Sequence, residues 1–464
     1  RPSKKEEKIR KYILDFAKAN GIDAKTDEVG NVVLSKPATP GKEDAPTVIM
    51  QGHMDMVCES NKKDFDFDNS PITTIIDGEW VHADNTTLGA DNGIGVAASL
   101  AVMADKSLVH GPLEALFTVD EETGMTGANN LGENMMNGSI LLNLDSEDDG
   151  QFFIGCAGGI DTTITFDYKR EMAPADYHWF DIELANLSGG HSGGDIHEGR
   201  ANSNKLLARF LFGLSQKHDI VLSEIRGGNL RNAIPRAAHA VVGVHTSKKE
   251  EVVVAFNEFV ADVKNEYSHT DPAMDITIAT ADKPEYAIDS DTTLRLIRSL
   301  YACPHGVISM SHDLEGLVET STNLASVKMQ PDNTILVTTS QRSSVESRKY
   351  DIANQIEALF LMAGAKVTHG DGYPGWAPNM NSAIMKIAAD TYKELYGEEP
   401  LITAIHAGLE CGLFLTKYPH LDMVSFGPTL RGVHSPSEKM HIPAVERFWD
   451  QLVTILRKVS DLKK

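Results

Sequence analysis

The chain has 464 residues, of which 41% are hydrophobic and 23% are charged, as in a folded soluble protein. A chain of this length exceeds one ordinary core, so we expect two or more domains. The net charge of −23 argues against nucleic acid and an anionic membrane surface as partners, and it favours a cytoplasmic protein.

The cysteines and the apolar segments further restrict the class of protein. The four cysteines are widely spaced and form no CxxC pair, so they predict neither a disulfide framework nor a thiolate zinc site. Reduced thiols fit the cytosol. No apolar run is long enough to span a bilayer, and we do not expect the highly charged segment 1–10 to be a signal peptide.

The first predicted elements are a helix, a hairpin and a buried strand. Apolar residues recur at helical spacing over residues 6–20, and Gly21 ends this helix. Residues 27–34 predict a hairpin with a Gly-Asn turn. The apolar residues 47–50 predict a buried strand, which stops at Gly52.

His53 and Asp55 follow directly on the predicted strand 47–50. Side chains two residues apart on an extended backbone point to the same face. One of them can therefore bind a metal ion while the other orients it. A lone His-x-Asp pattern is more often a turn, so the pair gains meaning only if further carboxylates and another histidine occur at similar places.

Asp91 lies in a Gly-rich loop at residues 87–95, before a helix of small residues that begins near Ile94. The loop lacks the Lys and the GxGxxG spacing of phosphate-binding loops. Its glycines instead let the backbone approach a compact group closely, with Asp91 directed at that group.

Two further strands are followed by carboxylates. Glu121 and Glu122 follow the predicted strand 113–119, and their side chains point in opposite directions, so one could bind metal while the other transfers a proton. Asp145 follows the predicted strand 139–144. Acids at a strand end are usually solvated. Their repetition at one kind of location, however, favours a shared site at one edge of a sheet.

The middle of the chain has a different order of elements. Strands and helices are predicted in the order β-α-β-β-α-β from residue 184, and a similar order returns before residue 373. We therefore predict an inserted α+β domain at 184–373 with two βαββαβ-like halves, between the two parts of a first domain at 1–183 and 374–464. Alternating strands and helices in those parts predict an α/β class, with a mixed sheet between helices in an α/β/α arrangement.

The C-terminal part adds the last candidate residues. His434 follows a predicted strand at 422–426. His406 and Glu410 are four residues apart and would share one face if their loop is helical. For this pair, contact with substrate is favoured over metal binding, and a structural role stays open.

These residue types suit a pair of divalent cations. Zinc accepts histidine nitrogen and carboxylate oxygen, as do cobalt and manganese, and the lack of cysteine ligands favours a catalytic site over a structural one. Two ions can share one carboxylate, for which Asp91 in its Gly-lined loop is the best candidate. Glu121 or Glu122 is placed to act as the general base.

Five motifs in this order resemble those of the M20 di-zinc metallopeptidases, most closely of their aminoacyl-histidine dipeptidase branch. The resemblance covers nearly the whole chain and rests on QGHMD at 51–55, GADNG at 89–93, DEETG at 120–124, NLD at 143–145 and GVHS at 432–435. It implies two zinc ions with five ligands: His53, Asp91, Glu122, Asp145 and His434. It further implies that Asp91 bridges the ions, that Asp55 orients His53, and that Glu121 is the general base and acid.

The resemblance also identifies the insert as a lid domain. It implies that His191, in SGGHSG at 188–193, helps to stabilise the oxyanion, and that Asn232 and Arg342 hold the substrate carboxylate or backbone. A guanidinium suits a carboxylate because its fork binds both oxygens. From the residues alone, a Gly-flanked His is more often a turn residue and a strand-end Arg is usually paired with solvent. The insert is about twice as long as the simple lid of many family members, which pair their lids across a dimer. A doubled lid could imitate that partner within one chain, so action of His191 in its own subunit and a homodimer both stay open.

The activity implied by the resemblance is hydrolysis of Xaa-His dipeptides, including those of the β-Ala-His type, by a hydroxide held between two zinc ions. The histidine preference rests on the branch alone, so a broader M20 di- or tripeptidase and an N-acyl amino acid amidohydrolase are the alternatives. A zinc-stabilised interaction protein without activity is disfavoured, because a structural site needs no proton carrier such as Glu121.

Overall fold

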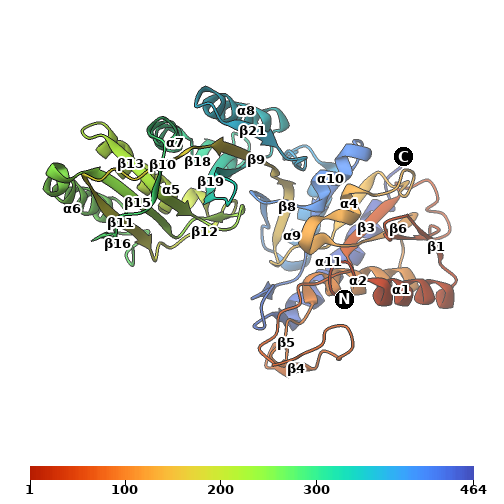
Figure 1. The fold of residues 1–464 in the computed structure, drawn as a ribbon. Helices are drawn as coiled ribbons and strands as arrows, with labels where there is room; N and C mark the ends of the chain where they lie inside the picture. The colour runs from red at the N-terminus through yellow and green to blue at the C-terminus, as the bar shows by residue number, and fades with distance from the viewer. Residues whose placement is uncertain (464) are drawn as a thin grey trace. The chain divides into compact units, whose positions relative to one another are not determined.

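The computed structural model describes residues 1–463, which form two compact units (Figure 1). Unit 1 comprises residues 1–156, 376–404 and the chain from residue 409 onward, and unit 2 comprises residues 157–375 and 405–408. The inserted part therefore begins at residue 157 rather than at residue 184. The reason is that β9 (Gly158–Asp167) pairs along its whole length with a strand of unit 2.

Unit 1 is built on an eight-stranded mixed sheet whose four central strands, β6, β3, β7 and β23, run parallel. Every residue of β3, β6 and β7 is buried, as expected for parallel strands covered on both faces. In spatial order the strands are β1 (Asp23–Thr26), β2 (Val32–Lys36), β6 (Leu113–Thr118), β3 (Val48–His53), β7 (Ile140–Asn143), β23 (Asp422–Ser425), β8 (Gln151–Cys156) and β22 (Leu401–Ile405).

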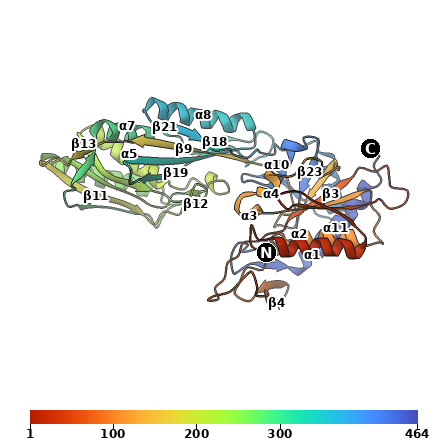
Figure 2. The same cartoon turned by 45° about the vertical axis from the view of Figure 1, so that its right-hand side comes forward.

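Helices lie along both faces of this sheet. Figures 1 and 2 show α1 (Glu7–Asn20), α2 (Ala90–Ala104) and α11 (Ile442–Val459) on one side, and α4 (Thr126–Asn129) and α10 (Glu410–Lys417) on the other. Helix α9 (Ala383–Tyr396) packs against α11. Unit 1 also contains a small four-stranded sheet, in the order β24 (Leu430–Arg431), β25 (Lys439–His441), β5 (Trp80–Ala83) and β4 (Thr74–Asp77).

Unit 2 holds two halves with the same strand order. The first half consists of β11 (Tyr177–Ala185), α5 (Ser203–Ser215), β13 (Ile220–Gly227), β15 (Ala238–His245), α6 (Lys249–Glu266) and β16 (Asp275–Thr280). The second consists of β9, α7 (Ser290–Ala302), β19 (Val318–Met329), β20 (Thr334–Ser343), α8 (Glu346–Met362) and β21 (Lys366–His369). The first strand of the second half thus precedes the entire first half in the chain, which a linear search for a repeated pattern cannot detect.

The two halves form one sheet in the order β16-β11-β15-β13-β19-β20-β9-β21, joined where β13 pairs antiparallel with β19. One hydrophobic core joins residues of the sheet with residues of all four helices, and Figure 2 shows α7 and α8 along one side of the strands. Short strands complete the unit: β10 (Arg170–Met172) pairs with β17 (Tyr286–Ile288), β12 (Gly190–His191) with β14 (Ala233–Ile234), and β18 (Gly306–Met310) with β19. Within residues 1–463, no helix is long and apolar enough to cross a membrane.

Candidate metal centre

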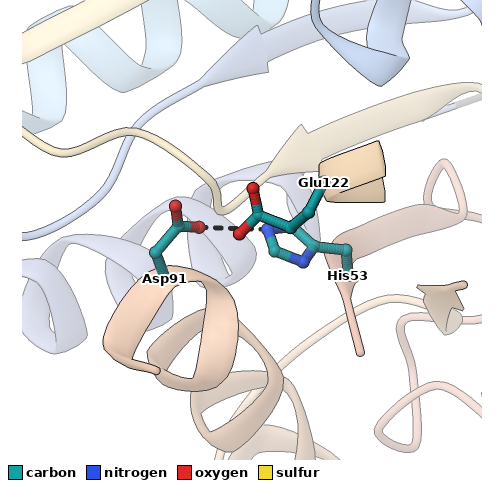
Figure 3. Close-up of side chains that lie close together, drawn as sticks. All are labelled: His53, Asp91 and Glu122. Atoms are coloured by element: carbon teal, nitrogen blue, oxygen red, sulfur yellow. Dashed lines mark hydrogen bonds and ion pairs between the residues drawn. The ribbon is translucent and has the colours of Figure 1, made fainter. Parts of the chain in front are cut away.

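The predicted ligands of unit 1 meet where its parallel strands end. His53 is the last residue of β3, Asp145 follows β7, and Glu122 lies in the short helix α3 (Glu121–Gly124) that follows β6. Asp91 lies in the first turn of α2, which enters with Gly89 at φ +72°. Figure 3 shows the side chains of His53, Asp91 and Glu122 converging from β3, α2 and α3.

Asp91 lies between the two histidines and directs one carboxylate oxygen at each. Its Oδ1 is 3.0 Å from His53 Nε2, and its Oδ2 is 3.2 Å from His434 Nε2. His53 Nε2 is also 3.3 Å from Asp145 Oδ1, and His434 Nε2 is 3.0 Å from Glu122 Oε2. The five side chains therefore form two His–carboxylate pairs joined through the shared Asp91.

The donor set fits divalent cations. One ligand atom each from His53, Asp91 and Glu122 lies within 4.8 Å of the others, as around a metal ion. Glu122 Oε1 is buried without a hydrogen-bond partner. A buried carboxylate oxygen without a partner is unfavourable unless a cation compensates it, so the geometry and this unpaired oxygen both favour bound metal.

Mutual charge interactions shift the pKa values of this cluster. Burial opposes the ionisation of Asp91, but its hydrogen bonds with His434 and His53 prevail and lower its pKa. Hydrogen bonds to Asp91 and Glu122 raise the pKa of His434 to about 11. Burial alone would lower the pKa of His53, but Asp145 and the other carboxylates raise it well above its usual value. A divalent cation would replace these imidazolium protons, because histidine binds metal in its neutral form.

Asp55 links His53 to the helix that carries the two glutamates. Its Oδ1 lies 3.4 Å from His53 Nδ1 and accepts a hydrogen bond from the Glu121 backbone N–H at 3.0 Å. Its Oδ2 accepts hydrogen bonds from Glu122 N–H at 3.2 Å and from Ser3 Oγ at 2.7 Å. Burial opposes its ionisation, but the interaction with His53, followed by the hydrogen bonds from Ser3 and Glu121, lowers the pKa of Asp55 to about 2. The ionised carboxylate thereby fixes the His53 ring and α3 relative to each other.

Glu121 has the environment of a proton carrier. Burial, together with the carboxylates of Asp145 and Glu410, raises the pKa of Glu121 well above its usual value, although His53 acts in the opposite direction. A carboxyl group with a raised pKa can both accept and return a proton near neutral pH.

Glu410 lies in a buried polar network beneath the strand ends. Its Oε2 accepts hydrogen bonds from Gln51 Nε2 at 2.6 Å and from Thr118 Oγ1 at 2.7 Å. Burial raises its pKa to about 8. Glu410 begins α10, whereas His406 precedes the helix and belongs to unit 2. The loop between them is therefore not helical, and the condition under which the two would share a helix face is not met.

Within unit 2, His191 is held in one tautomer. Its Nδ1 accepts hydrogen bonds from the backbone N–H groups of Gly193 and Gly194, at 3.2 and 3.0 Å. The ring proton therefore lies on Nε2, which makes this atom a hydrogen-bond donor. Burial and the nearby Arg342 lower the pKa of His191, so the ring is neutral at pH 7.

Arg342 and His406 lie in the same part of unit 2. Arg342 is 7% exposed and donates hydrogen bonds to Ser192 Oγ at 3.4 Å and to the Tyr373 hydroxyl at 2.8 Å. His406 Nε2 is 2.7 Å from Ser321 Oγ, and burial together with Arg342 lowers its pKa to about 3. Asn232 is exposed, and its backbone carbonyl accepts a hydrogen bond from Ser192 N–H at 2.8 Å.

The sequence interpretation missed several residues that support the centre. Glu438 is 2% exposed, and its carboxylate accepts hydrogen bonds from four consecutive backbone N–H groups, those of residues 88–91, at 2.7 to 3.3 Å. Its only sequence signal is its place four residues after His434. Gln51 and Thr118 bind Glu410. Gln51 stands in the QGHMD motif without a role of its own, and Thr118 lies inside the predicted strand 113–119.

Comparison with known proteins identifies the family. The model of peptidase family M20/M25/M40 matches residues 49–458. The chain belongs to this family. The match confirms the predicted resemblance and the prediction of a hydrolase of peptide bonds.

Two relatives of this M20 peptidase extend over nearly its whole length. The cytosol non-specific dipeptidase of Escherichia coli is 44% identical over 459 residues, which are 99% of this chain and 94% of that protein. The crystal structure of aminoacylhistidine dipeptidase from Vibrio alginolyticus matches with a TM-score of 0.92 and 45% identity, over 100% of this chain and 94% of that one. A tripeptidase from Staphylococcus aureus, with a TM-score of 0.57 and 16% identity, shares the fold. These matches confirm the predicted α/β class with a catalytic and a lid domain.

Proposed function

We propose that this M20 peptidase is a metal-dependent dipeptidase that hydrolyses Xaa-His dipeptides, including those of the β-Ala-His type. The observation that carries the proposal is Asp91, whose two oxygens face His53 and His434 at 3.0 and 3.2 Å. A carboxylate shared in this way is what a pair of metal ions requires.

Two divalent ions, zinc by preference with cobalt or manganese as substitutes, fit this arrangement. We assign His53 and Asp145 to one ion, His434 and Glu122 to the other, and Asp91 to both. Asp55 orients the His53 ring through its contact with Nδ1. Such ions would polarise the scissile carbonyl and lower the pKa of the attacking water to about 7.

Glu121 is the proton carrier of the reaction. Its carboxylate accepts the proton of the attacking water and delivers that proton to the leaving amine. Its raised pKa in the absence of a cation favours the return step, and positive charge at the centre would lower this pKa.

Unit 2 supplies the contacts for the substrate. The Nε2–H of His191 is a donor for the oxyanion of the tetrahedral intermediate, supported by the two amides that fix its tautomer. Arg342 and Asn232 are assigned to the substrate carboxylate and backbone, and Arg342 favours short substrates with a free carboxylate. We assign His406 to the same substrate contacts as Arg342 and Asn232. Glu410 lies in unit 1 and supports the metal centre. A homodimer stays open, so His191 of either copy could act on a given substrate.

The names of two relatives differ in the range of substrates that they describe. One is called an aminoacylhistidine dipeptidase and the other a cytosol non-specific dipeptidase. A broader dipeptidase is therefore the second candidate. The name of the second relative, together with the acidic composition, also supports a cytoplasmic location.

Hydrolysis of a dipeptide panel by the zinc-loaded protein tests the proposal. The panel contains β-Ala-His, Gly-His, Ala-His, Leu-Leu and one N-acetyl amino acid, and Glu121→Ala is measured alongside. Cleavage confined mostly to Xaa-His and lost in the variant supports the full proposal. Equal cleavage of Leu-Leu supports the broader dipeptidase, and failure to cleave any dipeptide refutes both.

A further inference from the structure

The side chain of Arg1 lies between two loops of unit 1 that carry proposed metal ligands. Its Nε donates a hydrogen bond to the Met54 carbonyl at 2.8 Å, and its Nη2 donates to the Gly89 carbonyl at 2.9 Å. Longer bonds from Nη2 reach the carbonyls of Asp55 at 3.4 Å and Asp91 at 3.5 Å. One guanidinium thus connects the loop after His53 with the loop that holds Asp91.

The glycines of the second loop leave room for this guanidinium. A Cβ at Gly89 would lie 3.0 Å from Arg1 Nη1 and 2.7 Å from the Met56 sulfur. A Cβ at Gly93 would lie 3.1 Å from Nη1 and 3.2 Å from Nη2. The glycines therefore permit, in part, the close approach of the Arg1 guanidinium to this loop.

The backbone of Arg1 and the residues that follow it also contact the loops of the proposed metal centre. The Arg1 carbonyl accepts a hydrogen bond from Met56 N–H at 3.0 Å, and Ser3 Oγ donates to Asp55 Oδ2 at 2.7 Å. Glu6 Oε1 accepts a hydrogen bond from the N–H of Asp120, the residue before the proposed base, at 2.9 Å. The segment 1–6 therefore contacts three of the loops that form the centre.

Arg1 and Glu438 bind complementary groups of the same loop. Glu438 accepts hydrogen bonds from the N–H groups of residues 88–91, whereas Arg1 donates to the carbonyls of Gly89 and Asp91. The carboxylate fixes the loop to the segment that carries His434. The guanidinium fixes it to the segment that carries His53.

We propose that Arg1 is a positioning residue of the metal centre, which sets the separation of His53 and Asp91 by binding the backbone of both loops. The inference rests on the proposed metal-dependent function. Residues that orient ligands from outside the coordination shell change metal affinity by about 10- to 100-fold when they are removed. Arg1 belongs to this class although it contacts neither the metal nor any ligand side chain.

The test compares Arg1→Ala with Lys36→Ala. Lys36 is a matched control because its Nζ donates hydrogen bonds to the carbonyls of Val102 at 2.9 Å and Asp105 at 2.5 Å, at the opposite end of the same helix α2. Both variants remove a part-buried cation that binds backbone carbonyls around this helix. Only Arg1→Ala removes the connection to the loop after His53.

Three quantities are measured for each variant: the zinc dissociation constant by competition with a chelator, the visible spectrum of the cobalt-substituted protein, and the urea midpoint without metal. Arg1→Ala is expected to weaken zinc binding about 10- to 100-fold and to alter the cobalt spectrum, whereas Lys36→Ala leaves both unchanged. Arg1→Lys, which keeps a cation but not the fork, is expected to recover part of the affinity.

Wild-type affinity and spectrum in Arg1→Ala overturn the inference, as does an equal loss of affinity in Lys36→Ala. If Arg1→Ala does not fold, Arg1→Lys decides by the same two readouts. A wild-type protein that binds no zinc refutes the proposed function itself, and this outcome is distinct from zinc binding that is indifferent to Arg1.

Discussion

Asp55→Asn tests whether the orientation of ligands controls the centre. The aspartate carboxylate faces His53 Nδ1 at 3.4 Å and accepts the N–H groups of Glu121 and Glu122 at 3.0 and 3.2 Å. An asparagine has almost the same shape but carries no charge and only one acceptor atom. Its amide nitrogen must therefore oppose the Glu122 N–H in one orientation, or the Glu121 N–H together with the His53 ring in the other.

The magnitude follows from these contacts. Hydrogen bonds to a charged group contribute about 1.5 to 3 kcal/mol each, so the loss of one lowers the free energy of unfolding by about that amount. The loss of an orienting carboxylate lowers metal affinity by about 10- to 100-fold, which corresponds to roughly 1.4 to 2.7 kcal/mol. We expect kcat to fall as well, because α3 carries the base.

Asp27→Asn is the matched control. Asp27 accepts four hydrogen bonds within unit 1, from Gly30 N–H, Asn31 N–H, Asn31 Nδ2 and Gly132 N–H, at 2.8 to 3.1 Å. Zinc affinity by chelator competition, kcat with Ala-His and urea unfolding are measured for both variants. Both should lose stability, but only Asp55→Asn should lose zinc affinity. Unchanged affinity in Asp55→Asn, or an equal loss in Asp27→Asn, refutes the reasoning.

Three further outcomes are expected. Removal of metal by a chelator should abolish activity and leave a folded protein by circular dichroism; unfolding would instead indicate a structural site. Burial raises the pKa of Glu410 from 4.5 to about 8, so the metal-free fold retains this proton and its unfolding free energy should decrease as the pH rises between these values. Glu410→Gln should flatten that slope in urea titrations at pH 5 to 8, and an unchanged slope would contradict the assignment. Arg342→Ala should raise KM for dipeptides at least about tenfold, through loss of a charged hydrogen bond, and a wild-type KM would exclude its role in carboxylate binding.

The sequence predicted the strand ends of the centre because each ligand follows a short apolar run. His53 is the last residue of a buried parallel strand, Asp145 and the Glu121–Glu122 pair lie shortly after two others, and parallel strands bring such positions to one edge. Asp91 was found through its glycines. Local patterns therefore pointed to these candidates, whereas His434 and the choice of Glu122 as a ligand came from the family resemblance.

The supporting residues depend on contacts between distant segments, which leave no local pattern. Glu410 binds Gln51 from 359 positions away, and Glu438 binds the loop of Asp91 from 347 positions away. The start of the insert was also placed too late. The burial of β9 alternates as in many strands, and its pairing with β20 and β21 assigns it to unit 2.

The separation of β9 from the rest of its half has a consequence for the order in which the chain acquires structure. The strands of the first half, residues 177–280, can pair with each other as soon as they are synthesised. Thr162 of β9, in contrast, contacts Gln341, which lies 179 residues further along the chain. Until β20 emerges, β9 has unpaired backbone groups that could join another chain. We therefore expect nascent chains that stop near residue 280 to aggregate through β9, and chains that reach residue 370 to be protected from it.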